Sequence, residues 1–198
     1  MCRVILAIVF VLSSISMAVA TDVQLDGPFQ VRYASNLNIG DSVINITNSG
    51  ASGGNICANV YTFDPAEEMV SCCSCSVTPN ALQSLSVRGS LTSNPLTPAI
   101  PTSVVVKLLA TTGTAACNPG TAYTSTNLAT GLLAWGTTIH AAPTSPVTYT
   151  VTETAFSPAT LSSTERHNIT SKCNFIQTNG SGFGICSGCS TGGLAPTP

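Results

Sequence analysis

Cysteine is the residue type with the greatest chemical potential in this chain, and its spacing is unusual. Nine cysteines occur among 198 residues. Three of them fall in the motif CCSC at 72–75, and two more form a C-x-x-C motif at 186–189. Cysteines at such spacings can bind zinc, exchange disulfides or form structural disulfides. The compartment in which the chain folds decides between these chemistries.

The N-terminus predicts export. Arg3 precedes an apolar run that ends at Ala18-Val19-Ala20, the small-x-small pattern after which signal peptidase cleaves. The strongly apolar part, Val4 to Leu12, is shorter than the roughly 20 residues that a membrane span requires. We therefore expect residues 1–20 to be a cleaved signal peptide, with no membrane span left after cleavage. The expected location is secreted, extracellular or at the cell surface, and the periplasm is also compatible.

Cleavage would remove Cys2 and leave an even number of cysteines in an oxidising compartment. Such a set is typical of a disulfide framework. The residues predicted to form disulfides are Cys57, Cys72, Cys73, Cys75, Cys117, Cys173, Cys186 and Cys189. Successive side chains of a strand point to opposite faces, so Cys72 should face one side of its strand and Cys73 and Cys75 the other.

A predicted hairpin indicates a partner for Cys57. The segments ICANVYTF and EEMVSCCSC are joined by Asp64-Pro65-Ala66-Glu67, which has the composition of a turn. A three-residue loop would place Cys57 opposite Cys73 or Cys75. We therefore predict a cross-strand disulfide from Cys57 to one of these two residues.

Two other uses of the cysteines are weaker. A four-thiolate zinc site would need Cys73, Cys75, Cys186 and Cys189, but C-x-C is a less usual partner for C-x-x-C, and an oxidising compartment favours disulfides. A redox-active C-x-x-C should open a helix after a strand, whereas the motif here follows a predicted helix. We predict no metal site and no cofactor.

Histidine and carboxylate residues give little support for catalysis. Only His140 and His167 could act as imidazole bases, and no G-x-S-x-G motif accompanies them. Glu67-Glu68 is an adjacent pair at a predicted turn, which is more typical of a solvated turn than of a glycosidase. We predict no catalytic residue. The alternative is a secreted enzyme or metal-binding protein that uses the cysteine cluster or His140.

Aromatic residues and asparagines supply the remaining candidate sites. Trp135 and the tyrosines could form a sugar-stacking platform, but their predicted alternation favours core packing for most of them. The tyrosines are Tyr33, Tyr61, Tyr123 and Tyr149. Three glycosylation sequons, which matter only in an organism that glycosylates this way, begin at Asn45, Asn168 and Asn179.

The elements that must position these residues are predicted to be strands. Apolar and polar residues alternate in about eight short segments separated by Gly, Pro, Asn and Ser, as in an antiparallel sandwich. Residues 103–112 (SVVVKLLATT) are apolar on both faces and predict a central strand. In LLAWGTTIHA, Leu133, Trp135 and Ile139 share one face, and His140 lies on the other. In VTYTVTETAF, Val147, Tyr149 and Val151 should share one face, and a row of threonines should face solvent on the other.

One helix is predicted near the C-terminus, at about residues 159–178. Ser157-Pro158 offers an N-cap followed by proline, and Ser162 with Glu165 would form a capping box if the helix began slightly later. Asn179-Gly180 supplies a C-terminal stop.

The predicted helix has an apolar stripe that includes a cysteine. Cys173 should therefore face the body of the domain, and the following segment could fold back and bring Cys186 or Cys189 to it. The residues of the stripe are Leu161, Ile169, Cys173 and Ile176.

The predicted fold is an all-β, disulfide-stabilised antiparallel β-sandwich of immunoglobulin-like type with one short C-terminal α-helix. A signal peptide at 1–20 precedes a single domain at 21–192 and a flexible tail at 193–198. Only 7% of residues are charged, and the net charge is −2. Binding to nucleic acid or to anionic lipid requires clustered Lys and Arg, which this chain lacks, so we exclude both.

Several segments together resemble a group of uncharacterised secreted bacterial β-rich proteins. These segments are NLNIGDSVINITN, MVSCCSCSVTPN, AWGTTIHA and NGSGFGICSGC. The resemblance covers most of the chain after residue 20 and implies a bacterial source, but it implies no activity and no functional residue. NIGDSVINITNSG also resembles the opening of many bacterial immunoglobulin-like modules.

These observations lead us to expect a secreted, non-enzymatic structural or adhesive protein of the cell surface or extracellular space. Low net charge weakens the repulsion that keeps copies of a protein apart. The expected partners are therefore copies of the same chain, in an oligomer or filament, or other surface components. Exposed strand edges would mediate these contacts.

Overall fold

A computed structural model describes residues 27–113, 117–122 and 128–189. The predicted signal peptide at 1–20 and the predicted tail at 193–198 lie outside these residues. Within them, no helix combines the length and the hydropathy that crossing a membrane requires.

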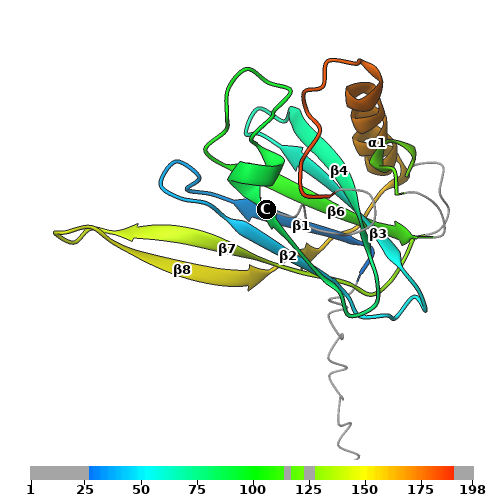
Figure 1. Ribbon diagram of the computed structural model, residues 1–198, viewed down its shortest axis with the longest axis horizontal. Coiled ribbons are helices and arrows are strands. Elements are labelled where there is room, and N and C mark those ends of the chain that lie inside the picture. Colours follow the sequence, from blue (N-terminus) through cyan, green and yellow to red (C-terminus); the bar gives the residue numbers. More distant parts are fainter. Residues whose placement is uncertain (1–26, 114–116, 123–127, 190–198) are drawn as a thin grey trace, which may run out of the picture.

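Within the described residues, nine strands form two antiparallel sheets (Figure 1). The first sheet has the order β4 (Met69–Val77), β3 (Ile56–Phe63), β6 (Val104–Thr112), β1 (Phe29–Ala34) and β9 (Ser157–Pro158). The second has the order β5 (Leu82–Ser86), β2 (Val43–Asn48), β7 (Leu132–Ala142) and β8 (Thr148–Ala155). Two short helical turns, η1 (Val87–Leu91) and η2 (Pro119–Thr121), and one α-helix, α1 (Ser163–Thr178), complete the described elements. The prediction of a β-rich antiparallel fold with one C-terminal helix is confirmed.

The first sheet is buried on both faces. One face joins residues of the second sheet in a core that includes Ile46, Val106 and Leu132. The opposite face packs against α1 in a second core that includes Leu109 and Ile169. β6 lies between β3 and β1 and contributes to both cores, which confirms that residues 103–112 contain a central strand.

Helix α1 begins four residues after the predicted start at 159. Its N-cap is Ser162, whose hydroxyl oxygen accepts a hydrogen bond from the Glu165 amide at 3.0 Å. The N-cap predicted at Ser157-Pro158 is wrong, because these residues form β9 and pair with Gln30 and Val31 of β1. The stop after the helix is confirmed, since Gly180 has a φ of 72°, in the region that favours glycine.

β7 and β8 form a hairpin that projects beyond the rest of the molecule (Figure 1). The first half of β7 is paired with β2, up to Gly136 opposite Ile44. Every residue of β8 is exposed. We call residues 138–154 of this hairpin the arm.

The alternation along β7 is correct, but the prediction that places Trp135 in the core is wrong. Leu132, Ala134 and Gly136 face the core, and Trp135 is 37% exposed on the outer face. The cause is Arg32 of β1, which is 7% exposed and lies between the sheets. A Cβ at position 136 would lie 2.6 Å from the Arg32 guanidinium carbon, so the inner face of β7 needs a glycine at this position.

Hydrogen bonds to β7 hold the buried Arg32 in place. One guanidinium nitrogen donates to the Gly136 carbonyl at 2.7 Å and to the Thr138 hydroxyl at 2.9 Å. Burial lowers the pKa of Arg32, and the charge of Glu153 partly opposes that shift. Arg32 thus connects the first sheet to the base of the arm.

Replacing Gly136 should weaken the fold because it crowds this guanidinium. We expect Gly136→Ala to lower the free energy of unfolding by about 1–3 kcal/mol, measured by denaturant unfolding. Gly54→Ala is the matched control, because a Cβ at that position meets nothing within 4 Å. A Gly136→Ala variant as stable as the Gly54→Ala variant would contradict this account of the register.

Candidate functional site

All eight cysteines predicted to form disulfides do so. The bridges are Cys57–Cys117, Cys72–Cys173, Cys73–Cys186 and Cys75–Cys189.

The predicted partner of Cys57 is wrong. Cys57 lies opposite Ser76, because the pairing of β3 with β4 shifts by one residue at a bulge between the positions of Thr62 and Phe63. The loop itself agrees with the predicted three residues, because the Asp64 amide donates to the Glu68 carbonyl at 3.0 Å, so the register shift alone moves Cys57 away from Cys75. Cys57 instead bonds to Cys117, which lies in the long connection after β6.

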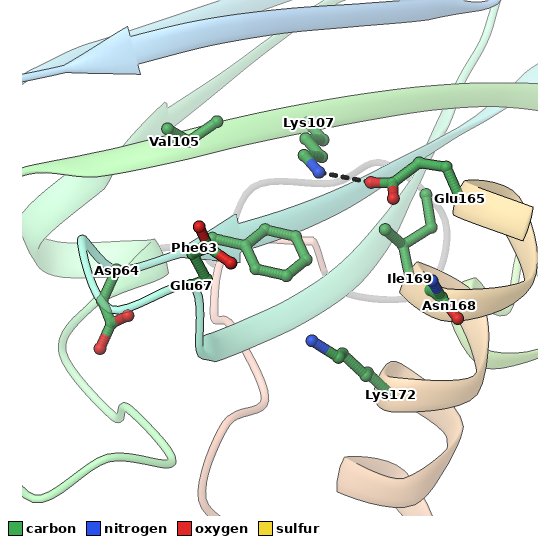
Figure 2. Close-up of a pocket in the computed structure, with 9 residues that line it drawn as sticks. All are labelled: Phe63, Asp64, Glu67, Val105, Lys107, Glu165, Asn168, Ile169 and Lys172. Carbon is green, nitrogen blue, oxygen red and sulfur yellow. Dashed lines mark hydrogen bonds and ion pairs between the residues drawn. The ribbon is translucent and has the colours of Figure 1, made fainter. Parts of the chain in front are cut away.

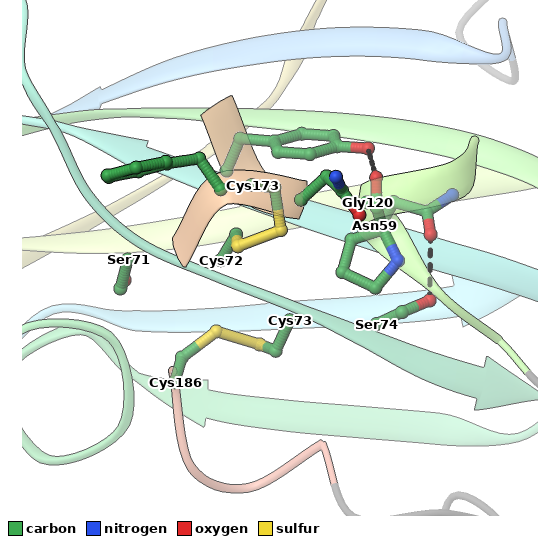
Figure 3. The surroundings of a disulfide bond; sticks show 12 residues. Asn59, Ser71, Cys72, Cys73, Ser74, Gly120, Cys173 and Cys186 are labelled. Carbon is green, nitrogen blue, oxygen red and sulfur yellow. Dashed lines mark hydrogen bonds between the residues drawn. A yellow bond between two sulfur atoms is a disulfide. The ribbon is translucent and has the colours of Figure 1, made fainter. Parts of the chain in front are cut away.

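The motif CCSC is linked on both faces of β4, as its alternation predicts (Figure 3). Cys72 faces the second core and bonds to Cys173 of α1. Cys73 and Cys75 face the core between the sheets and bond to the segment after the helix. The predicted contact of Cys173 with Cys186 or Cys189 is therefore wrong, because the helix and the C-terminal segment attach to opposite faces of β4.

This connectivity removes the thiols that zinc or redox chemistry would use. The four residues of the zinc hypothesis are divided between Cys73–Cys186 and Cys75–Cys189. Within the part of the chain that the structure describes, no group of three or more His, Cys, Asp or Glu side chains could hold a metal ion. The role of the cysteine cluster shown here is to attach two segments to one strand.

The three bridges of β4 are not energetically independent. With Cys73–Cys186 closed, Cys72–Cys173 closes a ring of about 14 residues, one from 72 to 73 and 13 from 173 to 186. Cys75–Cys189 then closes a ring of about five residues, two from 73 to 75 and three from 186 to 189. Loop-closure entropy gives about 3 kcal/mol for the larger ring and about 2 kcal/mol for the smaller one.

Removing Cys72–Cys173 should both destabilise the protein and loosen α1. We expect Cys72→Ala/Cys173→Ala to lower the free energy of unfolding by about 3 kcal/mol and to speed amide hydrogen exchange in α1. Cys75→Ala/Cys189→Ala is the control, with a smaller loss of about 2 kcal/mol and unchanged exchange in α1. Unchanged exchange in α1 after loss of Cys72–Cys173 would show that the bridge does not hold the helix.

The two histidines lie on different elements. His140 is exposed on the arm, and its Nε2 lies 2.9 Å from the Thr152 hydroxyl. His167 lies on α1, with its Nε2 3.4 Å from the Ser171 hydroxyl. Glu67-Glu68 lies at the exposed turn between β3 and β4. Among these residues the structure brings together no nucleophile, base and orienting carboxylate.

A cavity of about 420 Å³ lies between α1 and the first sheet (Figure 2). The Lys107 ammonium lies 4.7 Å from the centre of the Phe63 ring and forms an ion pair with Glu165. The Lys172 ammonium lies 5.6 Å from the same ring. Charged side chains of both signs line the cavity, including Asp64, so it does not select a ligand of one charge. The sequence did not indicate this cavity, because Lys107 is a single charged residue within the apolar segment that forms β6.

Most of the candidate aromatic residues do not pack in the core. Tyr33 and Tyr149 are exposed, as is Trp135, whereas Tyr61 is buried. Tyr123 lies outside the described residues. Core packing is therefore confirmed for Tyr61 and is wrong for the other three described aromatic residues.

The sequon asparagines are on the surface in three separate places. Asn45 is half-buried and donates a hydrogen bond to Glu153, Asn168 is exposed on α1, and Asn179 is the C-cap of that helix.

Three of the four sheet edges are short or covered. The β4 edge is covered by the C-terminal segment, because the Cys72 amide donates to the Gly184 carbonyl and the Cys186 amide donates to the Cys72 carbonyl. β9 is two residues long and ends in Pro158. β5 has five residues, and the side chain of Gln83 donates to the Gly188 carbonyl at 3.2 Å.

The fourth edge, β8, is long and open. It has eight residues and is paired only with β7 among the described strands. Val147, Tyr149 and Val151 are 54%, 56% and 63% exposed. Sequence alternation identified this row of residues, but it did not show that the hairpin leaves the sandwich. The arm is therefore the strongest candidate for a functional surface.

Comparisons of this chain with protein-family models, with curated proteins and with solved structures found no match.

Tyr61 provides a test of the packing beside the helix. Its hydroxyl donates to the Pro119 carbonyl at 2.9 Å, and burial raises its pKa far above the ordinary value. A raised pKa in the folded state gives stability that is fully present below about pH 10 and is lost as the pH rises above it.

We therefore expect stability to fall more steeply above about pH 10 in the wild type than in Tyr61→Phe. Denaturant unfolding across this pH range measures the difference. Tyr33→Phe, at a 60% exposed tyrosine, is the control and should follow the wild type. Identical pH profiles for the wild type and Tyr61→Phe would contradict the buried site.

Proposed function

We propose that this chain is an exported, non-enzymatic structural or adhesive protein that acts through its β7–β8 arm. The observation that carries the proposal is the open edge of β8, beside exposed Val147, Tyr149 and Val151. Proteins normally protect such an edge with lysine, proline, a bulge or a covering segment. β8 has no lysine or proline within Thr148–Ala155, and its pairing with β7 contains no bulge.

The disulfide framework supports export. Four bridges are typical of proteins that fold in an oxidising compartment and are rare in the cytosol. Together with the signal-like N-terminus, they support a location outside the cytoplasm. Eight of the nine described strands have five or more residues, and they lie in two antiparallel sheets around a shared core, which supports the immunoglobulin-like assignment.

The arm can serve as a contact element in a way that the cavity beside α1 cannot. Backbone groups along an unpaired edge bind another strand, and alternate side chains give that pairing its specificity. The arm also projects away from the sandwich, so a partner strand can reach it without displacing any other described element (Figure 1).

Charged residues on the arm should abolish this contact. We expect Tyr149→Lys/Val151→Lys to leave the fold intact, because both side chains are exposed, and to reduce self-association and retention on cells of the source organism. Sedimentation velocity and the protein retained on washed cells measure the two effects. Leu82→Lys, at a 66% exposed position on β5 at the other edge of the same sheet, is the control. Unchanged association and retention in the arm variant would contradict the proposal.

A further inference from the structure

We infer that the partner of the arm is the arm of a second copy, paired antiparallel across a two-fold axis with Val151 opposite Val151 of the second copy. This inference rests on the proposed function and specifies its partner. The four-stranded sheet of one copy would join the four-stranded sheet of the other copy at their β8 edges and form one continuous sheet.

The hydrogen bonds of the hairpin determine which backbone groups face the open edge. Opposite residues of an antiparallel pair alternate between those that exchange hydrogen bonds and those that do not. The Phe156 amide donates to the Ala134 carbonyl at 2.8 Å, so the residues of β8 at even positions bond to β7. Tyr149, Val151 and Glu153 therefore direct their amide and carbonyl groups outward, to where a second strand would lie.

Charge excludes the registers in which the axis lies closer to Glu153 than Val151 does. The carboxylate of Glu153 is the one charged group in Thr148–Ala155. Centring the axis on Val151 separates the two Glu153 residues by four positions, or about 14 Å along the strand. Centring it on Thr152 would bring them to about 7 Å, and centring it on Glu153 would place them opposite each other, where like charges destabilise a sheet.

The same register also matches the two faces of the arm. Val151 meets its own copy, and Tyr149 lies opposite Glu153, so the exposed apolar rows of both copies continue on one face. The threonines at positions 148, 150, 152 and 154 continue on the other face. β8 is complementary to itself in this register, which favours a second copy over an unrelated strand.

Two-fold pairing at this edge produces a closed dimer. Both subunits use the same edge, so the contact leaves neither copy with an unpaired β8 edge. The edges at β4, β5 and β9 are covered or short. We therefore expect association to stop at two chains instead of continuing into a filament.

Opposite charges at position 151 test the contact directly. We expect the purified, disulfide-bonded chain to dimerise in sedimentation equilibrium experiments over a concentration series. Val151→Lys and Val151→Glu should each weaken the dimer by about tenfold or more, because like charges then face each other across the axis. An equimolar mixture of the two variants should regain the dimer, because Lys now faces Glu. A mixture of Leu82→Lys and Leu82→Glu, which should each dimerise like the wild type, is the matched control.

The outcomes separate this inference from the proposal on which it rests. A mixture that stays monomeric while the wild type dimerises would overturn the register. A wild type that is monomeric at every concentration would overturn the two-fold pairing, and the proposed function would survive if Tyr149→Lys/Val151→Lys still lost retention on cells. Dimers that are unaffected by Val151→Lys, together with unchanged retention of the double variant, would overturn both.

Discussion

The alternation of side chains along β4 is the constraint on which the rest of the architecture depends. Because Cys72 and Cys73 are neighbours in a strand, their sulfur atoms must leave it on opposite faces. One face thereby receives α1, and the other receives the segment that follows it. A shift of one residue in this strand would exchange the two attachments. The covalent framework and the hydrogen-bonded register of the sheet therefore specify each other.

Local sequence features predicted the elements whose causes are also local. The helix begins at the later of its two candidate starts, the capping pair Ser162 and Glu165, Gly180 marked its end, and the split of CCSC followed from strand geometry alone. The partner of Cys57 could not be predicted in this way, because it depends on a bulge at Val70 in β4 and on a connection distant in sequence.

The orientation of β7 shows a second limit of local patterns. The alternation alone does not show which face is buried, and the large residues at 133, 135 and 139 predicted the wrong face as the core face. The small residues face inward instead, because a charged side chain from another sheet occupies the space beside Gly136. The candidate surface was predicted only as a strand with a solvated threonine face and an apolar face, since nothing in the strand itself shows that its hairpin extends beyond the sandwich.

The disulfide connectivity also has a consequence for biosynthesis. Ribosomes make the N-terminal cysteines first, yet three of the four bridges join β4 to residues between 173 and 189. Oxidation in order of appearance would join Cys57 to a cysteine of β4, and the native set would then require thiolate attack on that bridge. A chain that stops before Cys173 leaves three thiols on one strand without their native partners. The native disulfides of β4 can therefore form only after translation has reached the C-terminal segment.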